Sequence, residues 1–317
     1  MHTSNFTKQK LSVKNIQRAI WIVLAFLVAT LMLFGGYYYW DRYIHIGDKS
    51  PIELDVEALE QAIRDDPQNP EKRVALAEYY LDKGEPQKAF EQSNQVLKLY
   101  PENENAMLIA GLSAVQMEQP ETALPPLEKF VAARKDQPMA KTDNALETAY
   151  YFLGESYLKL KRPDDAISAL EAALTIKRTD ADALYQLGQA YQSVGQPEAA
   201  LERYQQAVRL VPDFSEAYSG MIESYTALNQ PDYVAYARGM QAFTLQDWQT
   251  AKTHLEYATQ ALPDFAPAFL GLGLTYEKLG DMKAAQTAIE KSIQLDKNNF
   301  AAQQALGRIQ ATLNAGE

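Results

Sequence analysis

A segment of about 34 residues returns along this chain, and the repetition limits the fold more than any other feature of the sequence. Its clearest copy reads ALYQLGQAYQSVGQPEAALERYQQAVRLVP, from Ala183 to Pro212. Related segments begin at Arg73, Tyr150 and Ala268. A fixed period of this length is typical of an array in which one structural unit is stacked many times, because a single unit cannot bury its own apolar face.

Each copy predicts two amphipathic helices joined by a turn. Apolar residues recur at spacings of three, four and seven, which place them on one face of a helix. A proline such as Pro197 stands where the second helix begins, a position at which proline is tolerated. Gly188 and Ala200 lack bulk, so the two helices can cross closely, while Tyr191 and Tyr204 fill the space between units.

The motif residues of the clearest copy are Leu184, Leu187, Gly188, Tyr191, Gly195, Ala200, Tyr204, Ala207 and Pro212. This pattern resembles the tetratricopeptide repeat family. The resemblance implies an all-α protein, a right-handed α-solenoid of stacked helix-turn-helix repeats. It also implies a concave surface, lined by the first helix of each repeat, that binds a protein or peptide.

The repeats predict a solenoid over residues 53–314. It begins with a half unit and ends with a capping helix over 301–313, whose glutamines suit an outer, polar face. Full repeats are expected near 70–103, 104–137, 147–180, 181–214, 232–265 and 266–299.

One helix, over residues 215–229, has no partner of its own in this scheme. An odd helix disturbs the alternation of first and second helices, so the array can bend or break near 229–232. The alternative is a continuous stack in which the next helix doubles as the partner, since helix packing tolerates a wide range of angles.

The N-terminal region predicts a membrane anchor. Residues 19–40, AIWIVLAFLVATLMLFGGYYYW, contain no charge and span about 30 Å as a helix. The alternative is a cleaved signal peptide, but no Ala-x-Ala-like site follows. Residues 1–18 form a basic tail with four cations, so we expect the tail in the cytoplasm, a linker over 41–52, and the repeats outside the cytoplasm. Two alanines in the anchor, four residues apart, would let two such helices pack closely. The sequence therefore allows a homo-oligomer, but nothing else in it supports one.

Composition excludes several function classes. The net charge is −11, and 26 basic residues face 41 acidic ones once the four cations of the tail are set aside. An acidic body lacks the cations that neutralise nucleic-acid phosphates. The chain has no cysteine, and His2, His45 and His254 have no metal-ligand spacing. We therefore expect no nucleic acid, metal or cofactor, and no catalytic residue stands out.

The concave surface of the predicted solenoid is the candidate site. Its outward positions carry apolar, aromatic and amide side chains but no lysine or arginine. Such a lining suits an apolar or amphipathic segment. The alternative is that some of these side chains face neighbouring repeats instead. The candidate groove residues are Val74, Leu108, Leu112, Tyr151, Glu155, Tyr185, Gln189, Tyr236, Met240 and Phe243.

Together these features predict a membrane-anchored scaffold or adaptor rather than an enzyme. Its role would be the assembly, secretion or maturation of proteins at a bacterial cell envelope. Two alternatives remain open: a cytosol-facing protein similar to organelle import receptors, and a non-catalytic subunit of a membrane enzyme complex. The absence of a basic clamp in the groove counts against the first of these.

Overall fold

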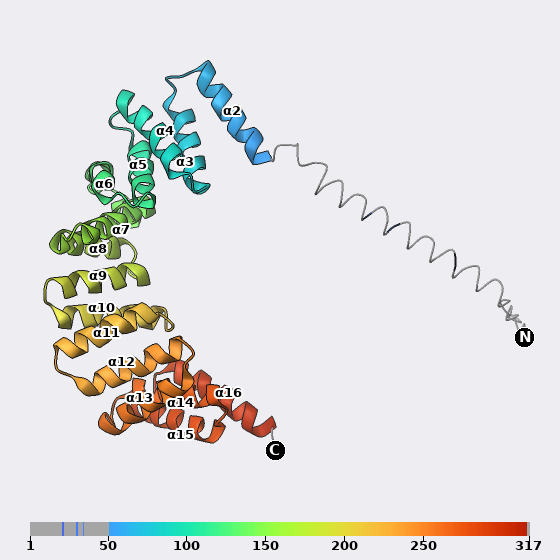
Figure 1. Ribbon diagram of the computed structural model, residues 1–317, viewed down its shortest axis with the longest axis vertical. Coiled ribbons are helices and arrows are strands. Elements are labelled where there is room, and N and C mark those ends of the chain that lie inside the picture. Colours follow the sequence, from blue (N-terminus) through green and yellow to red (C-terminus); the bar gives the residue numbers. More distant parts are fainter. Residues whose placement is uncertain (1–20, 22–29, 31–33, 35–50, 316–317) are drawn as a thin grey trace, which may run out of the picture. The chain divides into compact units, whose positions relative to one another are not determined.

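The computed structural model describes Trp21, Thr30, Phe34 and residues 51–315 (Figure 1). The chain divides into two units, Met1–Pro67 and Gln68–Glu317. The first contributes one complete described helix, α2 (Pro51–Asp65). The described part of the second is all-helical, with no strand: α3 (Pro70–Asp82), α4 (Pro86–Leu99), α5 (Glu104–Gln116), α6 (Pro120–Arg134), η3 (Ala140–Thr142), α7 (Asn144–Lys159), α8 (Pro163–Ile176), α9 (Ala181–Ser193), α10 (Pro197–Leu210), α11 (Ser215–Ala227), α12 (Pro231–Thr244), α13 (Trp248–Ala261), α14 (Ala266–Leu279), α15 (Met282–Leu295) and α16 (Phe300–Ala315).

The helices of the second unit pack in chain order as antiparallel pairs (Figure 1). The pairs are α3–α4, α5–α6, α7–α8, α9–α10, α12–α13 and α14–α15. Successive pairs pack against each other, except that the single helix α11 lies between α10 and α12. First helices also contact the first helices of neighbouring pairs, as α5 contacts α7. The all-α array of stacked helix pairs predicted from the sequence is confirmed.

Local sequence explains where these helices begin. The first helices α3, α5, α7 and α9 are each capped by an Asn or Asp side chain that accepts hydrogen bonds from backbone N–H groups of the first turn. The second helices α4, α6, α8 and α10 instead begin with proline, whose missing N–H would have had no partner there. In each of these four pairs the first helix begins with a polar capping residue and the second helix begins with proline.

A glycine of the first helix meets a large apolar side chain of the second in five pairs. A Cβ on Gly188 would lie 2.5 Å from Cε1 of Tyr204, and one on Gly239 would lie 2.6 Å from Cγ of Leu255. Distances this short exclude any side chain, so the glycine permits the close crossing. The spacing is 16 residues every time: Gly111–Leu127, Gly154–Leu170, Gly188–Tyr204, Gly239–Leu255 and Gly273–Ile289.

The turn inside each of these five pairs has a second fixed feature, a residue in the left-handed conformation seven positions after the contact glycine. The turns between α3 and α4 and between α11 and α12 have a left-handed residue too. Only some of these residues are glycine, although glycine adopts positive φ at no steric cost. The residues and their φ values are Gly84 (71°), Glu118 (56°), Lys161 (57°), Gly195 (73°), Asn229 (54°), Gln246 (62°) and Gly280 (83°).

Helix α12 belongs to two pairs at once. It is joined to α11 through a turn at Asn229 and to α13 through a turn at Gln246. Both of these residues have the left-handed conformation found in the other turns. It packs against both of these helices, while α11 lies beside α9 and α12 beside α14. A single hydrophobic cluster runs from Leu184 to Ala288 across the 229–232 turn. The stack is therefore continuous here, which is the second of the two arrangements that the sequence left open.

The structure corrects the predicted localisation. No helix in the described part of the chain is both long and apolar enough to cross a membrane. The longest of these helices, α7 and α16, have 16 residues, or about 24 Å against a hydrocarbon core of about 30 Å. The prediction of a single-pass membrane protein with an extracytoplasmic repeat domain is therefore wrong. Segments 1–18, 19–40 and 41–50 lie outside the described residues, apart from Trp21, Thr30 and Phe34.

The turn geometry predicts a stabilising substitution. Lys161 has a φ of 57°, a backbone conformation that is strained in any residue with a Cβ. We expect Lys161→Gly to raise the free energy of unfolding by about 1 kcal/mol. The matched control is Lys129→Gly, at an exposed position inside α6. This substitution should lower the free energy of unfolding by about 1 kcal/mol, because glycine is unfavourable within a helix. Urea denaturation measures both, and a loss of stability in Lys161→Gly would contradict the role assigned to the turn.

Candidate functional site

Four of the predicted groove residues come together in one cavity. Tyr151 and Glu155 lie on α7, and Tyr185 and Gln189 lie on α9. The two helices are neighbouring first helices, so residues one repeat apart lie at equivalent places. The cavity has a volume of ≈ 440 Å³. Its remaining walls are Leu158, Lys159, Asp182, Gln186 and Phe214.

Hydrogen bonds and ring contacts hold the two tyrosines in place. Gln186 Nε2 donates to Tyr151 Oη over 2.9 Å, and Gln189 Nε2 donates to Tyr185 Oη over 2.9 Å. The Tyr185 ring lies 5.0 Å from that of Phe214 and 5.8 Å from that of Tyr204, between ring centroids. Neighbouring repeats are therefore connected through the cavity wall, which orders these side chains before any ligand arrives.

The Gln186 side chain leaves one polar atom without a partner. Its Oε1 is buried and accepts no hydrogen bond, while its Nε2 is engaged by Tyr151. An unsatisfied buried acceptor costs about 1–3 kcal/mol. A ligand N–H group that reached this amide after a small side-chain rotation would recover part of that cost.

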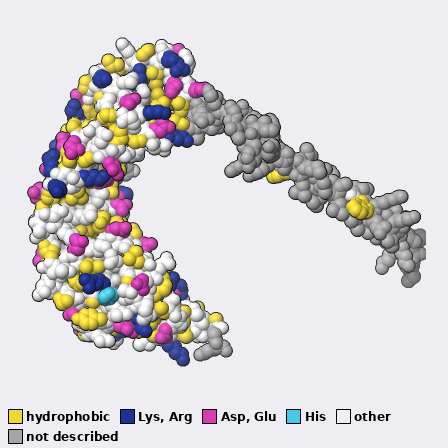
Figure 2. Space-filling view, in the orientation of Figure 1, with side chains coloured by type: hydrophobic (Ala, Val, Ile, Leu, Met, Phe, Trp, Pro, Cys, Tyr) yellow, Lys and Arg dark blue, Asp and Glu magenta, His cyan; other side chains and the backbone are white. Residues whose placement is uncertain are grey.

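The charged side chains of the cavity are mostly acidic. Glu155 pairs with Lys159 over 2.7 Å, and Asp182 is exposed at the edge. Burial first, and then the negative charges of Asp182 and Glu155, raise the pKa of the Tyr151 hydroxyl. Burial, followed by Glu216 and Glu223, raises the pKa of Tyr185. Over the visible surface as a whole, Figure 2 shows cationic and acidic side chains intermixed.

The other predicted groove residues do not line this cavity. Val74, Tyr236 and Met240 are buried, the last two in the cluster that surrounds α12. Leu108 and Leu112 are half-buried on α5. The half-buried Phe243 packs edge-on against Trp248, with 5.1 Å between ring centroids. The three buried side chains agree with the alternative that the helical spacing left open, while the groove role of Leu108, Leu112 and Phe243 stays a prediction.

Sequence reasoning missed several residues of the cavity, among them Asp182, Gln186 and Phe214. Asp182 and Gln186 flank the predicted Tyr185 on α9, within one turn on either side. The period of the repeat assigns one face to a helix, so residues at the edge of that face are easily omitted. Phe214 lies in the connection before α11, where helical periodicity gives no signal.

Within the described residues, no group of three or more His, Asp or Glu side chains could hold a metal ion. The described histidine, His254, is half-buried on α13, away from the tyrosine cavity. The cavity itself offers amides, hydroxyls and one ion pair, which are groups that recognise a ligand.

Two segments of the chain match the family described as tetratricopeptide repeat. Residues 145–213 cover α7 to α10, and residues 266–299 cover α14 and α15. The chain is a tetratricopeptide repeat protein. A third segment, residues 56–130, matches the family described as anaphase-promoting complex, cyclosome, subunit 3. The residues that line the cavity between α7 and α9, apart from Phe214, therefore lie within the longer of the two tetratricopeptide matches.

Solved structures give the same fold. The crystal structure of MamA protein is 25% identical, with a TM-score of 0.50, and the match covers 56% of this chain and 92% of that chain. The structure of MamA 41-end from Desulfovibrio magneticus RS-1 is 20% identical, also with a TM-score of 0.50, over 56% of this chain and 96% of that chain. No curated protein sequence matches the chain.

The buried tyrosines predict a loss of stability in alkali. The folded-state pKa of Tyr151 lies above the ordinary value of 10.0, so the unfolded chain releases this proton first. The stabilisation that Tyr151 provides is therefore complete below about pH 10 and is lost as the pH rises through the folded-state pKa. Tyr157 and Tyr276, whose pKa values are raised to about 12, act in the same direction.

We expect the free energy of unfolding to fall as the pH rises above about 10, and Tyr151→Phe to make that fall shallower. Urea denaturation at a series of pH values measures it. The control is Tyr100→Phe, since Tyr100 is exposed on the surface. Equal slopes for both variants would contradict the buried, acidic surroundings assigned to Tyr151.

Proposed function

We propose that this protein is a scaffold that binds a peptide segment of a protein partner in the cavity between α7 and α9. The observation that carries the proposal is the pairing of Tyr151 and Tyr185, one repeat apart, around a single cavity of ≈ 440 Å³. Peptide and small-ligand sites are commonly concave, largely aromatic or apolar, and equipped with a few polar groups. This cavity has those properties in its aromatic walls and its two glutamine amides.

The chemistry of the walls indicates the partner segment. The rings of Tyr151, Tyr185 and Phe214 offer apolar contact area to large side chains. Gln186 and Gln189 also line the cavity, and their amides, which donate to the two tyrosine hydroxyls, can exchange hydrogen bonds with a peptide backbone. We therefore propose an apolar or amphipathic segment as the ligand. The family resemblance supports the same class of partner, because stacked repeats of this kind present extended binding surfaces.

Site-specific photo-crosslinking tests the proposal. A crosslinking amino acid replaces Gln189 in the cavity and, as the control, Glu202 on α10, which is also accessible. We expect a discrete protein to be captured from position 189 and not from position 202. Mass spectrometry identifies that protein, and peptides covering its sequence locate the bound segment.

Binding of the located peptide then provides the quantitative test. Tyr151→Ala should weaken binding by about tenfold or more, because buried aromatic residues dominate such interfaces. The matched control Tyr257→Ala removes an exposed tyrosine of α13 and should leave the affinity unchanged. Equal capture from positions 189 and 202, or an affinity that Tyr151→Ala does not change, would contradict the proposal.

A further inference from the structure

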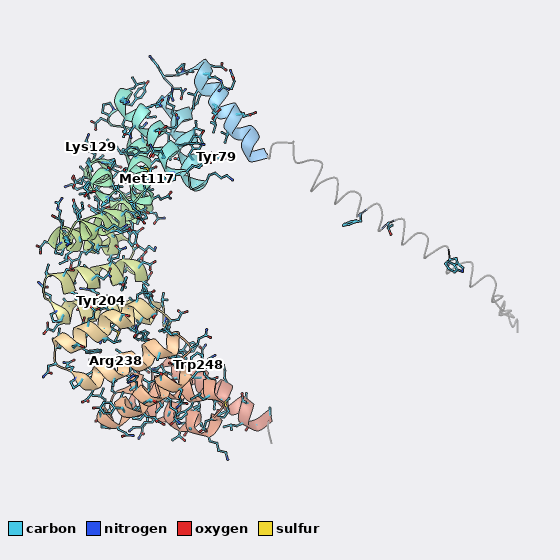
Figure 3. All side chains as sticks on the ribbon, in the orientation of Figure 1. Tyr79, Met117, Lys129, Tyr204, Arg238 and Trp248 are labelled. Carbon is cyan, nitrogen blue, oxygen red and sulfur yellow. The ribbon has the colours of Figure 1, made fainter. Side chains whose placement is uncertain are left out.

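The pair formed by α11 and α12 lacks the glycine contact of the five pairs described above, as does α3–α4, which has the small residues Ala77 and Ser93 at the two equivalent positions. Counting from its left-handed turn residue, Asn229, the glycine position is Ile222 and the apolar position is Arg238, again 16 residues later. Ile222 is half-buried on α11. Arg238 is exposed on α12 and is labelled in Figure 3. A β-branched side chain opposite an arginine cannot reproduce the close crossing, so the space between these helices stays open.

A cavity of ≈ 500 Å³ occupies this place. Its lining comes from α11, α12 and the start of α13, and it is separate from the tyrosine cavity between α7 and α9. The apolar wall consists of Ile222, Ala242 and Leu245, and the Leu245 side chain is 65% exposed. The remaining lining residues are Ser219, Glu223, Arg238, Gln241, Asp247, Thr250 and His254.

Most polar groups around this cavity are already satisfied. Gln241 Nε2 donates to Ser219 Oγ, and Glu223 accepts from Gln192 of α9. Asp247 accepts from the backbone N–H of Thr250 at the start of α13. Arg238 differs, because it makes no hydrogen bond or ion pair with any described residue. Its guanidinium offers several donors beside an exposed apolar wall.

We propose that this cavity is a second binding site, which takes one large apolar residue of a protein partner. The side chain of that residue packs against Ile222, Ala242 and Leu245, in the space that a large apolar side chain fills in the five pairs with the glycine contact. An oxygen of the same residue accepts hydrogen bonds from Arg238. That oxygen is a backbone carbonyl within the partner rather than a C-terminal carboxylate, because the acidic side chains of Glu223 and Asp247 line the same cavity.

The test uses the full chain with isotope-labelled methyl groups, so that the Ile222 and Leu245 signals report on the cavity by NMR. The probes are N-acetyl-leucinamide, N-acetyl-leucinate and N-acetylglycinamide. We expect both leucine probes to shift these signals with affinities of the order of millimolar, as suits ligands of this size. The glycine probe lacks the apolar side chain and should not shift them.

The two leucine probes test the choice of an internal carbonyl. We expect N-acetyl-leucinamide to bind at least as tightly as N-acetyl-leucinate, because Glu223 and Asp247 repel a carboxylate. Tighter binding of N-acetyl-leucinate would overturn the internal carbonyl in favour of a C-terminal carboxylate. Absence of any shift up to about 20 mM, equal shifts with the glycine probe, or shifts confined to α7 and α9 would overturn the proposal.

Variants connect the binding to the pair formed by α11 and α12. Arg238→Gln should weaken both leucine probes about fivefold, whereas the control Arg209→Gln, an exposed arginine of α10, should not. The double variant Ile222→Gly with Arg238→Leu restores the contact between a glycine and a large apolar side chain, and the new leucine fills the cavity between α11 and α12. It should abolish the Leu245 shifts, with circular dichroism showing that the chain is folded. Unchanged probe binding by either Arg238→Gln or the double variant would also overturn the proposal.

Discussion

The contact between a first-helix glycine and a large second-helix side chain is the interaction on which the stack depends. Glycine removes the one atom that would hold the helices apart, and the facing Leu, Tyr or Ile fills the space. Tyr204 extends the contact, because its ring lies against Gly188 of its own pair and Gly220 of α11 (Figure 3). One side chain thereby fixes both the crossing within a pair and the contact with the next helix.

The single odd helix shows what happens where this contact is missing. Helix α12 is the second helix of one pair and the first helix of another, so its sequence must satisfy two partners. It keeps the contact with α13 through Gly239 and Leu255 and gives up the contact with α11. Tyr218, Met221 and Tyr236 keep the core continuous around this place, while the open space appears at the surface.

The sequence predicted the helix pairs well because their physical signals are local: periodicity, proline at helix starts and small residues at crossings. It predicted the tyrosine cavity only in part. Tyr151 and Tyr185 were predicted from their position in the repeat, and both line the cavity. Tyr236 has the same position on α12 but is buried, because α11 also packs against that helix. Phe214 comes from a connection without a repeating pattern. The membrane prediction depended on residues 19–40 alone, and no helix among the described residues supports it.

A double-mutant cycle on Gly154 and Leu170 tests the central contact most directly. Gly154→Ala should cost about 1–3 kcal/mol by overpacking, and Leu170→Ala about 2–5 kcal/mol by leaving a cavity. In the double variant the added methyl enters the vacated space. We therefore predict a total loss at least about 1 kcal/mol smaller than the sum of the single losses, measured by urea denaturation. Losses that add to within about 0.5 kcal/mol would show that the two residues do not pack against each other, and would contradict the account.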